Sequence, residues 1–135
     1  MTDSAPPLDF YFDFSSPYGY LMSEKIDAVA ARHGRKVRWH PILLGVIFKA
    51  TGGAPLTLQN PAKAAYSIHD FERSARFMGI PYRHPSHFPL ATQNAARVYW
   101  WLQAQDPLRA VAWARAGLRA YFTRGVNLMD IAQLK

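Results

Sequence analysis

The chain has 135 residues, half of them hydrophobic, and a formal net charge of +7. It contains no cysteine, which excludes disulfide scaffolding, thiolate metal sites and dithiol redox chemistry by this chain alone. No stretch approaches the roughly 20 apolar residues that a membrane span needs, and the N-terminus lacks the basic, apolar and small-residue sections of a signal peptide. Length and composition predict one soluble, cytoplasmic protein with a hydrophobic core.

The positive charge is unevenly distributed. Acidic residues are absent between Ala28 and His69, where the chain carries Arg32, Arg35, Lys36, Arg38, Lys49 and Lys63. No basic run exceeds two residues in this stretch, and no nucleic-acid-binding motif is present. We therefore expect anionic small molecules rather than nucleic acid as partners.

The chain begins with a short flexible lead, residues 1–7, followed by an aromatic-rich strand from Leu8 to Phe14. Ser16 and Pro17 then predict a helix start. The serine side chain accepts from a backbone amide of the first turn, and proline at the first helical position lacks only an N–H that has no partner there. This helix is expected to continue to Arg32 or His33, before Gly34.

A second short strand is predicted from Lys36 to His40, stopped by Pro41. Strand, helix and strand form a βαβ unit, so the two strands should be parallel with a right-handed crossover.

The remainder of the chain is predicted to be helical. One or two turns are expected from Gly45 to Ala50, before Gly52 and Gly53. Two further cap-and-proline starts, Asn60-Pro61 and Asp106-Pro107, predict helices to Met78 and to Phe122 or Thr123. A helix from about Ala91 to Gln103 lies between them, after an extended loop with three prolines, IPYRHPSHFPL.

Three segments, FYFDFSSPYGYL, HPILLGVIFKATG and KAAYSIHDFERSARFMGIPYRHPSHFP, resemble the 2-hydroxychromene-2-carboxylate isomerases. These enzymes are relatives of the kappa-class glutathione transferases, in the DsbA-like branch of the thioredoxin superfamily. Ser16 stands where redox members of that superfamily carry a cysteine. The resemblance extends from about Asp9 to Asn127.

The resemblance implies an α/β fold in which an N-terminal thioredoxin-like half, residues 1–44, precedes an inserted all-helical domain, residues 45–135. Family members are about 200 residues long and have further thioredoxin strands and a cis-proline loop after the helical part. The comparison thus implies a C-terminally truncated chain. It also implies a homodimer and glutathione as cofactor.

For the chemistry, the resemblance makes Ser16 the catalytic residue, whose hydroxyl donates a hydrogen bond to the glutathione sulfur. The N-terminus of a helix favours the thiolate over the thiol. The alternative for Ser16 is a helix cap without a chemical role.

The resemblance points to Gly53 and Lys63 for glutathione binding, with the substrate carboxylate as the other candidate ligand of Lys63, and to Lys49 for substrate binding. Tyr18, which follows the serine, Tyr66 and Phe88 are further candidates for substrate binding. Gly53 departs from the asparagine of many relatives and has no side chain to offer glutathione. Each residue also has a structural alternative: a solvated lysine, a packed aromatic side chain, or a loop anchored in the core.

Other side chains are expected to be structural. Asp70 and Arg73 predict an ion pair on one helical face, and Trp100, Trp101 and Trp113 are interpreted as core of the helical part. The five histidines lack a convincing ligand spacing, so we expect no metal site.

The resemblance implies glutathione-dependent cis-trans isomerisation of 2-hydroxychromene-2-carboxylate, or of a related aromatic acid, to the benzylidenepyruvate in aromatic catabolism. Two alternatives stay open. One is a kappa-type glutathione transferase or peroxidase. The other is a non-catalytic fragment that acts only in binding or dimerisation.

Overall fold

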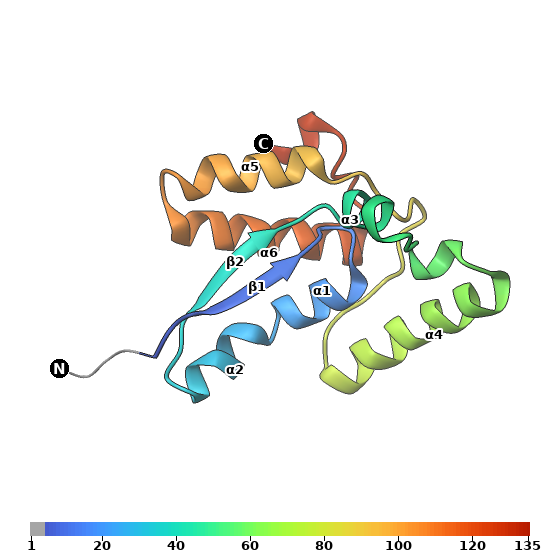
Figure 1. Ribbon diagram of the computed structural model, residues 1–135, viewed down its shortest axis with the longest axis horizontal. Coiled ribbons are helices and arrows are strands. Elements are labelled where there is room, and N and C mark those ends of the chain that lie inside the picture. The colour runs from blue at the N-terminus through green and yellow to red at the C-terminus, as the bar shows by residue number, and fades with distance from the viewer. Residues whose placement is uncertain (1–4) are drawn as a thin grey trace.

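The computed structural model describes residues 5–135 and begins with a βαβ unit (Figure 1). Strand β1 (Leu8–Phe12) leads into helices α1 (Pro17–Ser23) and α2 (Ile26–Arg32), and strand β2 (Val37–Pro41) follows. The strands are parallel, with Leu8 opposite Val37 and Phe12 opposite Pro41. The predicted parallel pair is confirmed. Pro41, which was expected to stop the second strand, is instead its last residue.

The N-terminal lead was predicted to be flexible. Its first four residues lie outside the described part of the chain. Within the remainder, the Arg35 side chain donates to the carbonyl oxygens of Pro6 and Pro7, at 2.6 and 3.2 Å.

The crossover between the strands consists of two helices, so the prediction of one continuous helix from Ser16 to Arg32 was wrong. The Lys25 amide bonds to the Met22 carbonyl, three residues back, and this tight turn separates α1 from α2. Just before it, the buried Ser23 hydroxyl donates to the Tyr20 carbonyl at 2.6 Å. A serine that bonds to the preceding turn competes with the regular helical pattern and bends the chain.

The rest of the chain is helical, as predicted. Helix α3 (Leu44–Thr51) and the 3-10 turn η1 (Leu56–Leu58) precede α4 (Pro61–Met78). Helices α5 (Gln93–Gln103) and α6 (Pro107–Arg124) form an antiparallel pair, and the 3-10 turn η2 (Ile131–Leu134) closes the chain (Figure 1).

Each of the three predicted cap-and-proline helix starts is confirmed. The side chains of Ser16, Asn60 and Asp106 accept hydrogen bonds from first-turn amides of α1, α4 and α6, at 3.0, 2.8 and 3.1 Å. Gly79 and Gly125 end α4 and α6 with φ values of 68°. Side-chain caps and left-handed glycines satisfy the backbone groups that helix ends leave open.

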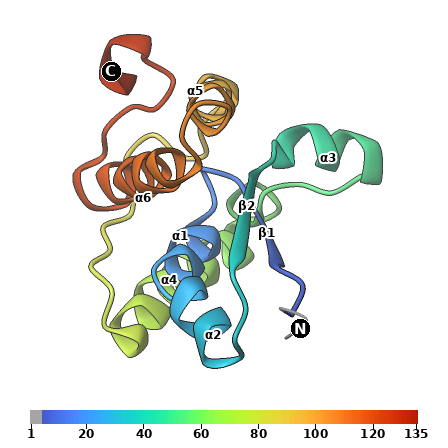
Figure 2. The same ribbon diagram turned by 90° about the vertical axis from the view of Figure 1, so that its left-hand side faces the viewer.

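The hydrophobic core lies between the strand pair and the helices. Phe10 and Phe12 of β1 are buried, whereas Asp9 and Tyr11, which alternate with them, are exposed. In Figure 2, α1, α2 and α6 lie to one side of the strands, which agrees with this alternation. The buried side chains of α5 and α6, among them Tyr99, complete the core.

Trp100, Trp101 and Trp113 were interpreted as core residues, and this was wrong for two of them. Trp113 packs against the core, but Trp100 and Trp101 are 43% and 64% exposed. Consecutive helical residues differ in direction by about 100°, so Tyr99 and Leu102 take the buried face and the two tryptophans point outward.

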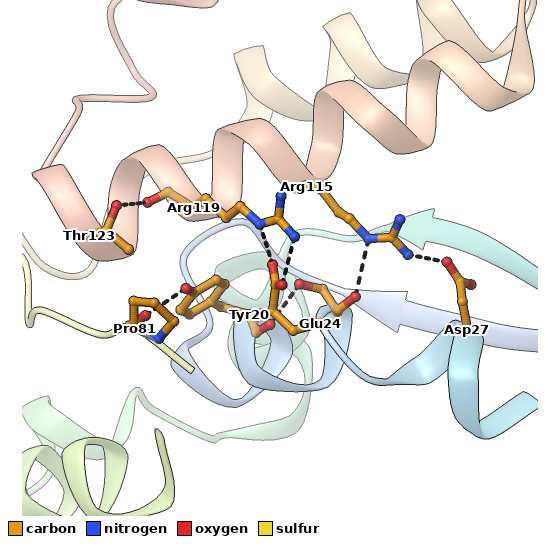
Figure 3. Close-up of polar contacts among 8 residues, drawn as sticks. Tyr20, Glu24, Asp27, Pro81, Arg115, Arg119 and Thr123 are labelled. Carbon is orange, nitrogen blue, oxygen red and sulfur yellow. Dashed lines mark hydrogen bonds and ion pairs between the residues drawn. The ribbon is translucent and has the colours of Figure 1, made fainter. Parts of the chain in front are cut away.

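Charged contacts join α6 to the α1–α2 segment (Figure 3). The Arg119 guanidinium forms a two-bond ion pair with the Glu24 carboxylate, both bonds at 2.7 Å. The Arg115 guanidinium pairs with Asp27 and lies 5.1 Å from the Trp39 ring centre. These contacts connect helix α6 to the crossover between β1 and β2. Among residues 5–135, no helix is both long enough and apolar enough to span a membrane.

Candidate functional site

The site is built around the turn that joins β1 to α1. Ser16 has an extended backbone conformation, and its Oγ accepts a hydrogen bond from the Gly19 amide at 3.0 Å. A Cβ atom at Gly19 would lie 3.1 Å from the Ser16 Cβ and 3.2 Å from its Oγ. The glycine therefore leaves room for the serine cap, whose own hydroxyl hydrogen remains available to a ligand.

A buried carboxylate holds this turn in place. Asp13 Oδ1 accepts hydrogen bonds from the Ser15 amide at 2.8 Å and the Thr92 hydroxyl at 2.7 Å. Its Oδ2 accepts from the Leu44 amide at 2.8 Å. Three segments thus meet on one side chain that is 5% exposed: the β1–α1 turn, the start of α3 and the start of α5.

The long loop before α5 is bound to the same turn. The buried Ser15 Oγ accepts from the Leu90 amide at 2.8 Å, and the Tyr121 hydroxyl donates to the His87 carbonyl at 2.7 Å. The Phe88–Pro89 peptide bond in this loop is cis. These contacts place Phe88 and Pro89 beside Ser16.

A cavity of about 300 Å³ opens beside Ser16. Its walls come from the β1–α1 turn, α3, the η1 turn, α4 and the loop before α5. The apolar members are Pro17, Leu44, Phe48, Pro55, Leu56, Phe71, Phe88, Pro89 and Leu90, and the members with polar side chains are Asp13, Ser15, Ser16, Tyr18 and Thr57. A mostly apolar cavity with a few polar groups is typical of small-molecule sites.

Tyr18 connects this cavity to α4. Its hydroxyl donates to the Asp70 carboxylate, and its ring lies edge-on to Phe71 at 5.0 Å. Burial, followed by the hydrogen bond to Asp70, raises the pKa of Tyr18 to about 12. The same hydrogen bond, followed by the one from Arg73, lowers the pKa of Asp70. Tyr18 is therefore a neutral donor at physiological pH.

The predicted Asp70–Arg73 pair is confirmed, at 2.6 Å between Arg73 Nη2 and Asp70 Oδ1. Sequence reasoning did not anticipate that Tyr18, 52 residues earlier, would join this pair.

Phe88, which lines the cavity, also packs in a cluster of aromatic side chains. The His84 ring lies 4.8 Å from Phe88 and 6.2 Å from Phe71. Tyr82 and His84 share a hydrogen bond of 2.9 Å between the hydroxyl and Nδ1. Burial lowers the pKa of His84, which favours the neutral ring. Within residues 5–135, no three metal-ligating side chains gather closely enough to hold an ion.

The cavity brings together three of the seven predicted site residues. Ser16, Tyr18 and Phe88 line it, whereas Lys49, Gly53, Lys63 and Tyr66 do not. The latter four are exposed, on α3, on the connection after it and on the first turns of α4. Their roles as ligand contacts remain predictions.

Gly53 nevertheless affects the cavity indirectly. A Cβ atom there would lie 2.8 Å from Cδ1 of Phe48, which forms part of the wall. The present position of the Phe48 ring thus requires a residue without a side chain at position 53.

Sequence reasoning missed several wall residues. Asp13 carried a usable signal, because a charged residue at the end of an otherwise buried strand requires partners. Ser15 and Thr57 carried no such signal, since their positions depend on how the loop before α5 and the η1 turn fold back onto α1.

Known proteins are similar to this chain over most of its length. Residues 7–135 match the family model described as DSBA-like thioredoxin domain. The chain is 33% identical over 126 residues to glutathione S-transferase kappa 1 of Caenorhabditis elegans, covering 85% of this chain and 55% of that protein. It is 30% identical over 129 residues to 2-hydroxychromene-2-carboxylate isomerase of Sphingobium xenophagum, covering 95% and 64%.

A solved structure of 2-hydroxychromene-2-carboxylate isomerase superimposes with a TM-score of 0.76 at 25% identity, covering 90% of this chain and 59% of the other. The chain thus spans little more than half the length of several relatives it matches. The parallel βαβ start, the helical continuation and these matches agree, and the chain belongs to the family of DsbA-like thioredoxin domains.

Proposed function

We propose that this protein uses glutathione to isomerise 2-hydroxychromene-2-carboxylate, or a related aromatic acid, to the corresponding benzylidenepyruvate. The observation that carries the proposal is the position of Ser16. It caps α1 with one lone pair, keeps its hydroxyl hydrogen and lies in the wall of an apolar cavity of about 300 Å³. Two kinds of relatives, the isomerases and the kappa glutathione transferases, support the choice of chemistry.

In the proposal, the sulfur-bearing end of glutathione binds in this cavity. A thiolate needs a hydrogen-bond donor and a favourable electrostatic environment, which the Ser16 hydroxyl and the positive end of α1 supply. When bound, glutathione supplies a nucleophilic sulfur that adds reversibly to a conjugated substrate and leaves unchanged. In the proposal Ser16 donates to that sulfur and favours its ionised form.

The other predicted residues have roles in binding. Lys63 and the backbone at Gly53 contact glutathione, and Lys49 contacts the carboxylate of the substrate. Tyr18, Tyr66 and Phe88 contact its aromatic part. Phe71 and Phe88 give the cavity two aromatic side chains, 6.4 Å apart, against which a flat ring can pack. The proposal includes a cytoplasmic homodimer.

The experiment compares two helix-cap variants. Ser16→Ala and Asn60→Ala each remove a side-chain cap ahead of a proline at the first helical position. Each should lower the free energy of unfolding by about 1 kcal/mol. Isomerisation, followed by ultraviolet absorbance with and without glutathione, should fall about 100-fold only in Ser16→Ala, because a preorganised donor to a developing anion is lost.

Glutathione-dependent turnover by the native chain is the first requirement, and its absence overturns the proposal. Equal turnover by the native chain and the Ser16→Ala variant would also contradict it. Asn60 does not line the cavity, so its variant controls for the loss of a cap alone.

A kappa-type transferase is the second candidate, favoured by the 33% identity to glutathione S-transferase kappa 1. Conjugation of glutathione to 1-chloro-2,4-dinitrobenzene, measured beside isomerisation, separates the two. Conjugation without isomerisation would favour the transferase.

A further inference from the structure

Most polar side chains in the cavity wall have a hydrogen-bond partner within the protein. Both carboxylate oxygens of Asp13 accept internal hydrogen bonds, and the Tyr18 hydroxyl donates to α4. Ser15 and Ser16 each accept a backbone amide and each retain a hydroxyl hydrogen. The remaining polar side chain in the wall is Thr57, in the η1 turn.

The Thr57 hydroxyl differs from the other polar groups of the wall. Its Oγ1 is buried and is the single buried side-chain nitrogen or oxygen atom between residues 5 and 135 that has no hydrogen-bond partner. Burial without a partner costs free energy, so such groups in folded proteins call for an explanation, and a ligand is one of them. The location of this hydroxyl in the wall of the candidate site favours a ligand.

The side chain can reach a ligand without a change in the backbone. The three staggered χ1 positions of threonine exchange the hydroxyl with the methyl group and the hydrogen on Cβ. Pro55 and Leu56, which precede Thr57, also line the cavity. Thr57 itself lines the cavity as well, so a change of χ1 can exchange its hydroxyl with the group that now borders the cavity.

The chemistry of the wall limits which group of the ligand Thr57 contacts. None of the lining residues in the described part of the chain is a lysine, arginine or histidine. A carboxylate buried there would lack a counter-charge, so it stays toward solvent. An uncharged hydroxyl can enter the cavity and both donate to and accept from threonine.

We propose that Thr57 is a specificity-determining residue that hydrogen-bonds the uncharged ring hydroxyl of an ortho-hydroxylated aromatic acid. This assignment rests on the proposed function and adds to it the feature of the substrate that the cavity recognises. Ser16 serves the sulfur, and Thr57 distinguishes the hydroxylated acid from its unsubstituted analogue.

The test measures the affinity for two probes, trans-o-hydroxybenzylidenepyruvate and trans-benzylidenepyruvate, which differ by that hydroxyl. Calorimetry without glutathione avoids turnover. The native chain and Thr57→Ser should bind the hydroxylated probe about 3- to 10-fold more tightly, as expected for one hydrogen bond. Thr57→Val keeps the shape of the side chain and should bind both probes equally.

Thr51→Val is the matched control, because the Thr51 hydroxyl donates to the Ile47 carbonyl at the end of α3 and lies outside the cavity wall. It should keep the native preference. Circular dichroism verifies that each variant is folded, and Thr57→Ala replaces Thr57→Val if the latter is unfolded.

The outcomes separate the two proposals. A native chain without a preference, or a Thr57→Val variant that retains it, overturns the role of Thr57 and leaves the proposed isomerisation to the Ser16→Ala test. A native chain that binds neither probe nor glutathione overturns the proposed function and the assignment of Thr57 together.

Discussion

The Thr92 hydroxyl donates a 2.7 Å hydrogen bond to the buried carboxylate of Asp13, across 79 residues of sequence. Together with the amides of Ser15 and Leu44, this bond joins the turn before α1 to the starts of α3 and α5. The wall of the candidate site is thus held together by one side chain, both of whose carboxylate oxygens accept hydrogen bonds from within the protein.

Asp13→Asn is expected to lower the free energy of unfolding by about 2 to 4 kcal/mol. The amide NH2 group would face one of the three donors that now point at the carboxylate, which leaves buried donors without an acceptor. Urea unfolding followed by circular dichroism measures the change.

Asp106→Asn serves as the control for Asp13→Asn. Asp106 is exposed and caps α6, and asparagine caps helices about as well as aspartate, so this variant should change stability by less than about 0.5 kcal/mol. Similar losses in both variants would contradict the anchoring role of Asp13.

Tyr18→Phe is expected to raise the pKa of Asp70 toward the ordinary value for aspartate. The hydrogen bond from Tyr18 is the main cause of the lowered pKa, ahead of the bond from Arg73. NMR titration of the Asp70 carboxyl carbon tests this directly. Ser74→Ala removes a longer bond of 3.5 Å and should produce a smaller rise. An unchanged pKa in Tyr18→Phe would refute the coupling.

Stability is expected to fall between about pH 10 and pH 12. Burial raises the pKa of Tyr18, Tyr20 and Tyr121 to about 12 each, above the value near 10 of an unfolded chain. The neutral phenols favour the folded state, so their contribution is complete below pH 10 and is lost as the pH rises through 12. Absorbance at 295 nm follows the ionisation, and thermal unfolding follows the stability.

Tyr20→Phe checks which groups carry this alkaline effect. The variant loses the 2.6 Å bond to the Pro81 carbonyl, so it should be less stable at pH 8, and its stability should then depend less on pH above 10. A slope equal to that of the native chain would exclude Tyr20 as a contributor.

Gly117→Ala is expected to stabilise the protein by about 0.5 to 1 kcal/mol. The residue lies inside α6, and an added Cβ would contact Phe14 at 3.5 Å, an ordinary van der Waals distance. Alanine also restricts the unfolded chain more than glycine does. The change is read from the urea midpoint.

Gly125→Ala is the opposite case on the same helix. Gly125 ends α6 at φ 68°, where an alanine is strained by about 1 to 2 kcal/mol. Destabilisation by both substitutions would mean that the α6–Phe14 contact has no room for a methyl group.

The sequence was sufficient to predict the features that depend on neighbouring residues. Ser16, Asn60 and Asp106 cap the helices they were expected to cap, since a short polar side chain followed by proline determines a helix start locally. The parallel strand pair followed from the order of the elements.

Features that depend on distant contacts could not be predicted in this way. The break after Ser23 and the outward direction of Trp100 follow from which helical face the fold buries. The cavity around Ser16 includes Thr57 and Leu90, which only the folded chain brings together. The boundary between two domains at residues 44 and 45 remains a prediction.

The short distance between Gly53 and Phe48 has a consequence for the evolution of the family. A side chain at position 53 and the present Phe48 ring compete for the same space, since an added Cβ would lie 2.8 Å from the ring. Substitution at one position therefore requires an adjustment at the other. In an alignment of homologues the two positions should covary, with asparagine at 53 accompanied by a smaller or differently oriented side chain at 48. A homologue with a side chain at position 53 should therefore have a differently shaped cavity wall where Phe48 lies in this chain.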